Sequence, residues 1–280
     1  MRAALAAALL VAVAPGRAPG AARATLVACA PGYPGSTAEA QPNMDALAAA
    51  VARGASWPAG AFAAVYVPSE RDGVARLAEP DAAAALVPVP FWVKHAAALK
   101  LEPRLAVASD PTREATEVWT LVAKRGRVAA PTGLVGFTIS SAAGYAPEFV
   151  RAVLAEWGRL PADARIVQSA QVLSALRRAA AGEDVAVLLD GTQAAALPSL
   201  PFAGELEAVA RSAPIPSGLL VRVADRLPRE RWRALEHALV ALPSAPEGAA
   251  ALQALRIGRF VPLGAEALAS IERLRAGAAR

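Results

Sequence analysis

Two short segments rich in glycine and hydroxyl side chains each follow an apolar stretch, and such segments can bind an anion. The first, residues 32–37, follows the apolar residues 24–30, and the second, residues 140–145, follows residues 136–139. Each segment precedes a pattern typical of a helix, so its backbone N–H groups would lie at the positive end of a helix dipole. Two such turns, far apart in the chain, predict two lobes that close on one ligand.

The candidate ligand contacts come first from these two turns. They are Tyr33, Gly35, Ser36, Thr37, Ser140, Ser141, Ala143, Gly144 and Tyr145. A structural alternative stays open for several of them, because a serine or threonine at such a place also caps a helix, which contributes about 1 kcal/mol. Either role suits Ser36, Thr37 and Ser141. Tyr33 can form an aromatic wall of a cleft, and Tyr145 can equally be a packed aromatic residue.

Two further candidates stand at the ends of apolar runs. Asp190 follows the apolar residues 185–189 and precedes Gly191. Its carboxylate can bind the cationic part of a zwitterionic ligand, or it can cap a helix that begins at Gly191. Pro90 ends the apolar run 82–89 and offers backbone groups to the predicted cleft. We expect both residues to contact the ligand.

The sequence contains few of the residue patterns that catalysis or metal binding requires. The sequence has no Gly-x-Ser-x-Gly, no Walker Gly-Lys-Ser/Thr and no His-Glu-x-x-His motif. The acids Asp81, Glu117 and Asp190 show no spacing that pairs two of them, and His95 and His237 have no cysteine or acidic cluster beside them. We therefore expect a binding protein that is not an enzyme and has no metal and no cofactor.

The N-terminal residues 1–24 predict a signal peptide. Met1 and Arg2 form a short basic region, residues 3–14 are apolar, and Ala22-Arg23-Ala24 fits a small-x-small cleavage site. The apolar region is too short to span a bilayer, and no later stretch reaches the roughly 18 apolar residues of a membrane helix. Cys29 ends a lipobox-like sequence, but a Pro/Gly/Arg-rich stretch separates it from the apolar region. We interpret Cys29 as a small residue of the first buried strand.

The charge of the chain argues against nucleic acid as a partner. The formal net charge is +5, and three of the cations, Arg2, Arg17 and Arg23, belong to the predicted signal peptide. The remaining arginines alternate with acids, as on solvated helix faces, and form no basic stripe.

Strand and helix patterns alternate along the rest of the chain, which predicts an α/β fold. Met44, Leu47 and Val51, for example, are spaced for one buried face of a helix over residues 37–53. The predicted strands cover residues 24–30, 61–67, 82–89, 104–108, 117–123, 136–140, 164–168, 184–189, 206–210 and 218–223. The other predicted helices cover residues 72–77, 91–99, 147–157, 170–180, 228–242, 246–255 and 265–275.

Several of these stretches, in this order, resemble one protein family. They are the strand 118–123 with residues 131–139, the serine-containing residues 140–147, the helix and strand 170–191 that end in Asp190-Gly191, and residues 212–228. Together they are similar to the substrate-binding proteins of phosphate/phosphite/phosphonate-type ABC transporters. These proteins belong to the type II periplasmic binding protein superfamily, and the resemblance covers essentially all of the chain after residue 24.

The resemblance implies a two-lobed fold in which each lobe is a mixed sheet flanked by helices. Lobe one would comprise residues 25–115 and 217–280, and lobe two residues 116–216, with the strands 117–123 and 218–223 as a two-strand hinge. It also implies a periplasmic monomer that captures a small anionic or zwitterionic ligand, an oxyanion of the phosphate, phosphite or phosphonate type. An ABC transporter permease would be its partner.

Two other classes of function stay open. One is a ligand-sensing protein that presents its closed form to a membrane receptor. The other is a secreted α/β hydrolase or transferase that uses Asp190.

Overall fold

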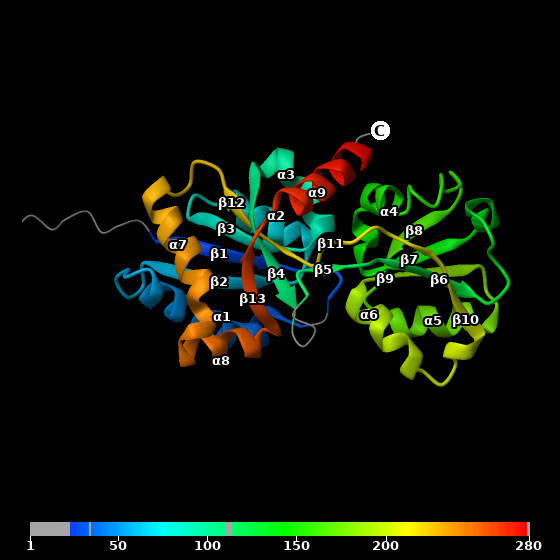
Figure 1. Ribbon diagram of the computed structural model, residues 1–280, viewed down its shortest axis with the longest axis horizontal. Helices are drawn as coiled ribbons and strands as arrows, with labels where there is room; N and C mark the ends of the chain where they lie inside the picture. Colours follow the sequence, from blue (N-terminus) through cyan, green and yellow to red (C-terminus); the bar gives the residue numbers. More distant parts are fainter. Residues whose placement is uncertain (1–22, 34, 110–113, 279–280) are drawn as a thin grey trace, which may run out of the picture.

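The computed structural model describes residues 23–33, 35–109 and 114–278, and it shows two lobes side by side along the long axis (Figure 1). Each lobe has a mixed β-sheet flanked by helices, which confirms the predicted α/β architecture. The predicted signal peptide lies outside the described residues except for Arg23 and Ala24, and Ala24 already belongs to strand β1. Within the part that the structure describes, no helix is long and apolar enough to cross a bilayer.

Lobe one is built on a six-stranded sheet in the order β13-β4-β12-β3-β1-β2. The strand β1 runs parallel to β2 and β3, whereas β12 lies antiparallel between β3 and β4. Every residue of β1 is buried, which explains why all of them except Thr25 are apolar, including Cys29, as predicted. The hydroxyl of Thr25 donates a hydrogen bond to Oδ2 of Asp81 at 2.6 Å. The strands are β1 (Ala24–Cys29), β2 (Phe62–Val67), β3 (Ala82–Val87), β4 (Leu101–Ser109), β12 (Leu219–Val223) and β13 (Ile257–Pro262).

Helices cover both faces of this sheet. On one face α1 packs against α7 and α8, and the predicted residues Met44, Leu47 and Val51 are all buried there. On the other face α2 packs against α3, and α3 packs against α9. The helices are α1 (Thr37–Gly54), α2 (Glu70–Ala78), α3 (Val89–Leu99), α7 (Arg229–Ala241), α8 (Pro246–Ala254) and α9 (Ala265–Ala278).

Lobe two is built on a five-stranded sheet in the order β10-β6-β9-β7-β8. Its central strand β9 is fully buried, and it pairs parallel with β7 and antiparallel with β6. The strands are β6 (Thr120–Lys124), β7 (Thr138–Ser141), β8 (Arg165–Gln168), β9 (Val185–Leu189) and β10 (Leu206–Arg211). The helices are α4 (Pro147–Val153), α5 (Val172–Ala181) and α6 (Gly191–Ala196).

The chain crosses between the lobes twice, through a short antiparallel ladder. The ladder pairs β5 (Thr116–Glu117) with β11 (Ile215–Pro216). The longer hinge strands predicted over 117–123 and 218–223 are therefore wrong in extent, because residues 120–124 belong to the sheet of lobe two and residues 219–223 to that of lobe one. The apolar side chains of these residues are buried within the two sheets. Only the short strands β5 and β11 therefore form the ladder between the lobes.

Three other elements differ from the sequence prediction. The strand β13 was not predicted, because its glycine and proline are unfavourable within a strand. The structure places it at the edge of its sheet, where both residues are tolerated. The strand β4 is longer than predicted, and helix α4 ends at Val153 rather than at residue 157.

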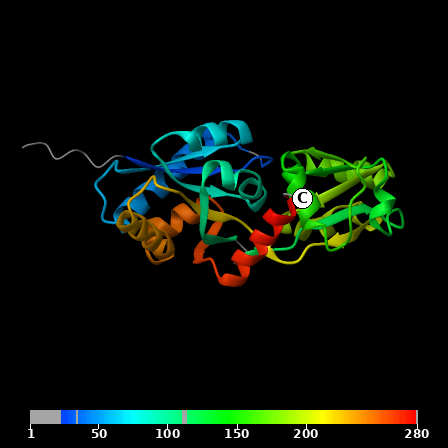
Figure 2. The same cartoon turned by 90° about the horizontal axis from the view of Figure 1, so that it is seen from above.

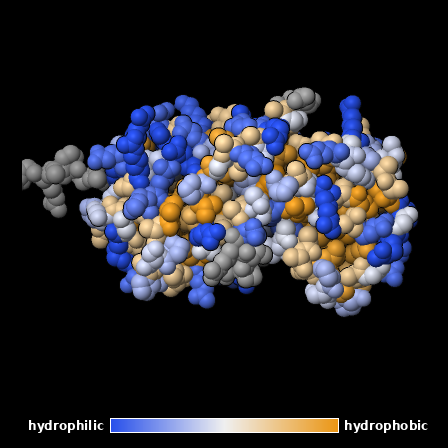
Figure 3. Space-filling model, in the orientation of Figure 1, coloured by the Kyte–Doolittle hydropathy of each residue, from blue (hydrophilic) through white to orange (hydrophobic). Residues whose placement is uncertain are grey.

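The two lobes share apolar packing on one side. The C-terminal helix α9 packs against α3 of lobe one and against α4 of lobe two, as the view from above also shows (Figure 2). Its Ile271 is fully buried in a core cluster that contains Trp92 of α3 and Phe149 of α4. On the face seen in Figure 3, hydrophilic residues cover much of lobe one, and lobe two shows more apolar surface.

Candidate functional site

A cavity of about 290 Å³ opens where the strands β1, β3 and β4 end at their carboxyl sides, next to lobe two. Such strand ends are where α/β proteins commonly bind ligands, and the volume is near the low end of roughly 300–1,000 Å³ for ligand pockets. The cavity is lined by Ala28, Cys29, Ala30, Tyr33, Met44, Tyr66, Leu86, Val87, Pro88, Val107, Ser109, Glu117, Asp190, Thr192, Ser217, Gly218, Leu255 and Ile257.

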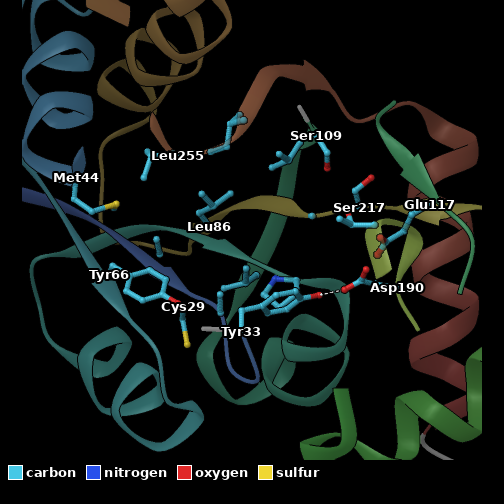
Figure 4. Close-up of a pocket in the computed structure, with 18 residues that line it drawn as sticks. Cys29, Tyr33, Met44, Tyr66, Leu86, Ser109, Glu117, Asp190, Ser217 and Leu255 are labelled. Carbon is cyan, nitrogen blue, oxygen red and sulfur yellow. Dashed lines mark hydrogen bonds between the residues drawn. The ribbon is translucent and has the colours of Figure 1, made fainter. Parts of the chain in front are cut away.

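The two ends of the cavity differ in character (Figure 4). Met44, Leu86 and Leu255 lie toward one end, and the carboxyl groups of Glu117 and Asp190 lie at the other. Most of the lining is therefore apolar, and lobe two contributes Asp190 and Thr192. We call this space the cleft cavity.

Asp190 both caps a helix and lines the cleft cavity. Its Oδ1 accepts a hydrogen bond of 2.8 Å from the backbone N–H of Gln193, within a capping box at the start of α6. Its Oδ2 accepts a bond of 2.9 Å from the hydroxyl of Tyr33, which belongs to lobe one. Burial raises the pKa of Asp190, and the Gln193 and Tyr33 bonds oppose that rise. The carboxylate thus joins the two lobes directly at the cavity.

Glu117 is the second acid of the cleft cavity, and it stands on the crossing strand β5. Its Oε2 accepts a bond of 3.0 Å from the backbone N–H of Gly191. Burial and the charge of Asp190 raise the pKa of Glu117 to about 8. Burial raises the pKa of Tyr33, and the charges of Asp190 and Glu117 raise it further. Two carboxyl groups therefore face one small space, and the charge of Asp190 disfavours the ionised form of Glu117.

The serine turn, residues 140–145, packs onto its own sheet instead of lining the cleft cavity. Ser141 is fully buried, and its hydroxyl donates to the carbonyl of Leu188 at 2.8 Å and accepts from the N–H of Ala143 at 3.2 Å. Ser140 is buried in β7. A Cβ on Gly144 would stand 2.2 Å from the carbonyl carbon of Val167, so only glycine fits this contact. The geometry at Ser141 is that of a cap.

The first turn meets the serine turn directly. A Cβ on Gly32, whose φ is +86°, would lie 2.3 Å from the carbonyl oxygen of Ala142, so the two backbones touch. The two turns thus come together as the sequence suggests, but in contact with each other. Lys94 adds a further link, since its Nζ donates to the carbonyl of Tyr145 at 2.5 Å.

The remaining predicted contacts lie outside the cleft cavity. Ser36 caps α1 in a capping box with Glu39, and Gly35 and Thr37 are exposed. Pro90 is buried in the first turn of α3. Burial raises the pKa of Tyr145, whose ring packs in the core shared by the lobes. Of the residues predicted from the sequence, the structure brings only Tyr33 and Asp190 into this cavity.

Several lining residues were not among the predicted contacts. The main ones are Met44, Tyr66, Leu86, Glu117, Ser217 and Leu255. The ends of the predicted strands were a usable signal for Leu86 and Tyr66, since ligands bind beyond carboxyl ends. Nothing in the sequence pattern brings Glu117 to Asp190, because their proximity depends on how the chain crosses between lobes. Among the described residues, no three His, Cys, Asp or Glu side chains gather as metal ligands.

Comparison with known proteins gives a result at the level of the fold. No family profile and no curated protein matches the chain. Among solved structures, XAC2383 from Xanthomonas citri bound to chloride has a TM-score of 0.72 at 15% identity, covering 91% of this chain and 98% of that chain. A second structure of XAC2383 contains ATP.

Two phosphonate-related proteins are also similar in structure. One is a binding protein component of an ABC phosphonate transporter from Pseudomonas aeruginosa, with a TM-score of 0.64, 12% identity, and coverage of 92% of this chain and 87% of that chain. The other is PhnD1 from Prochlorococcus marinus in complex with methylphosphonate, with a TM-score of 0.59, 12% identity, and coverage of 89% and 96%. The chain therefore has the fold of the type II periplasmic binding proteins.

Proposed function

We propose that this protein is an exported solute-binding protein that captures a small molecule between its lobes and delivers it to an ABC permease. The observation that carries the proposal is a largely apolar cavity at the strand ends of lobe one. Lobe two lines the same cavity with Asp190, which is hydrogen-bonded to Tyr33 of lobe one. A cavity bounded by two lobes with a short crossing ladder suits capture by hinge closure. In this proposal the protein works as a periplasmic monomer after removal of residues 1–24.

The predicted oxyanion is the second candidate ligand, and it would need the serine turn. The similarity to phosphonate-binding structures and the backbone N–H groups of that turn favour it. Two contacts argue against an oxyanion at this turn. The hydroxyl of Ser141 already donates to a carbonyl within lobe two, and the backbone of Gly32 lies against that of Ala142. An oxyanion would bind there only after the two turns separate.

A ligand panel on the protein recovered from the periplasm tests the proposal. A ligand present at about 1,000 times its dissociation constant adds roughly 4 kcal/mol to stability, which raises the melting temperature by roughly 8–16 °C in a chain of this size. The panel contains phosphate, phosphite, methylphosphonate, amines and neutral apolar solutes. We expect at least one solute to give such a shift.

A substitution that fills the cavity identifies where that solute binds. Leu255→Trp enlarges a side chain at the apolar end, whereas Leu268→Trp enlarges a surface residue of α9 that is 38% exposed. We expect the first variant to lose the ligand-induced shift and the second to keep it. An unchanged shift in both variants would place the ligand elsewhere and refute capture in this cavity.

Two further measurements separate the other classes of function. A binding protein returns its ligand chemically unchanged, so mass spectrometry of the released solute would show a product only for a hydrolase or transferase. Deletion of the gene should abolish uptake of the solute if the partner is a permease, and should leave uptake intact if the partner is a receptor.

A further inference from the structure

We propose that the cleft cavity selects a small organic cation, an amine with an apolar body. This inference rests on the proposed solute-binding function and names the ligand class of the same cavity. Its basis is the separation of an apolar end from an acidic end within one small space (Figure 4).

The apolar end would hold the body of the ligand. Met44, which is buried, and Leu86 and Leu255, which are partly exposed, lie there in Figure 4. Val107 and Ile257 add two buried apolar side chains to the lining of the cavity. Each buried CH₂ group of a ligand gains roughly 0.8 kcal/mol of transfer free energy, so an alkyl or aromatic body is favoured here. A fully hydrated inorganic ion would leave this wall without a partner.

The acidic end sets the sign of the ligand's charge. Glu117 and Asp190 are the only acids among the described residues that line the cavity, and no Lys, Arg or His lines it with them. A buried carboxylate is costly without a compensating charge. A carboxylate can accept hydrogen bonds at both oxygens. The N–H of Gly191 donates to Oε2 of Glu117, and the side chain of Trp119 also faces this carboxyl group. An ammonium group supplies both the missing charge and the donors.

The tyrosines of the cavity fit the same ligand. Tyr33 holds its hydroxyl on Asp190 and so fixes that carboxylate at the edge of the cavity. Tyr66 lies near Met44 at the apolar end in Figure 4, where its ring can pack against the apolar body of the ligand. An anion would meet the carboxylate of Asp190 and the acid Glu117 beside it, with no cation in the described lining to offset them, which disfavours binding. A neutral solute would leave the acid pair uncompensated.

Three probes of matched shape test the sign of the charge by titration calorimetry. Benzylamine, benzyl alcohol and benzoate share an aromatic body and differ in charge. We expect benzylamine to bind at least about tenfold more tightly than benzyl alcohol, because it adds a charge-assisted hydrogen bond, and we expect benzoate not to bind. Benzylamine binding at pH 7 should also release a proton, visible as a heat that depends on the buffer, since the ammonium replaces the proton held by the acid pair.

Substitution of the acid tests which residue is responsible. Glu117→Gln keeps the side-chain size and should weaken benzylamine by roughly 10- to 150-fold while changing benzyl alcohol little. Glu230→Gln, at an exposed position in the first turn of α7, is the matched control and should change neither. If Glu117→Gln does not fold, the order of the affinities of the three benzyl probes for the wild-type protein still decides the question.

Each contrary result overturns the inference in a distinct way. Equal affinities for amine and alcohol would mean that the acids do not select charge. Tightest binding of benzoate or methylphosphonate would reverse the sign, and failure of all three benzyl probes would exclude an amine with such a body. Capture between the lobes would survive these results if another solute is bound and Leu255→Trp abolishes its binding.

Discussion

The hydrogen bond between Tyr33 and Asp190 predicts that the hydroxyl of Tyr33 shifts the equilibrium between the open and the closed arrangement of the lobes. Tyr33→Phe removes only the oxygen that donates to Oδ2 of Asp190 at 2.9 Å and leaves the ring in place. A hydrogen bond to a charged acceptor contributes about 1.5–3 kcal/mol. If the bond forms only when the lobes meet, its loss shifts the closed-to-open ratio by roughly 10- to 150-fold.

Small-angle X-ray scattering measures this shift, because separation of the lobes enlarges the radius of gyration. Tyr66→Phe is the control, since it removes a hydroxyl in the same cavity from a residue that stands wholly in lobe one. We expect a larger radius for Tyr33→Phe alone. Scattering curves of wild type and Tyr33→Phe that superimpose, with equal melting temperatures, would show that the bond does not hold the lobes together.

Three further outcomes follow from contacts described above. Ser141→Ala should lower the free energy of unfolding by about 1–3 kcal/mol, measured by denaturant titration, because its buried partners lose their bonds, and it should leave ligand affinity in the cleft cavity unchanged. Gly32→Ala should open the lobes in the same scattering assay, since its Cβ would collide with the carbonyl of Ala142. Stability should fall as the pH rises from about 4.5 to about 8, by up to roughly 1.4 kcal/mol per pH unit, because the folded protein holds a proton on Glu117 that the unfolded chain releases. Glu117→Gln should remove that slope, and a slope that persists would assign it to other groups such as Asp190.

The elements of the fold could be predicted where local pattern and packing agree. The spacing of Met44, Leu47 and Val51 predicts α1, and the structure buries all three residues on one face. The apolar residues of β9 likewise predict a buried strand at the centre of lobe two. The crossing ladder could not be predicted, because Thr116–Glu117 and Ile215–Pro216 are too short to carry any periodicity.

The candidate site was accessible to sequence reasoning only in part. A glycine-rich turn and an acid after a strand point to Tyr33 and Asp190, and these residues do meet. The hydroxyl of Ser141 has the same local signature as an anion contact, but the direction of its bond depends on the neighbouring strand β9. The apolar lining, such as Met44 and Leu255, comes from helices and strands whose patterns indicate only a core. Sequence therefore identifies strand ends better than it identifies what lies beside them.

The place of β12 in the first sheet has a consequence for how the chain folds during synthesis. This strand lies between β3 and β4, yet it is made only after all of lobe two. Until then the nascent chain exposes the unpaired backbone edges of two strands, β3 and β4, which is a state prone to aggregation. Lobe two is continuous in sequence and can fold while the edges of β3 and β4 are still unpaired. A chaperone that holds the chain until the last third emerges should therefore raise the yield of soluble protein.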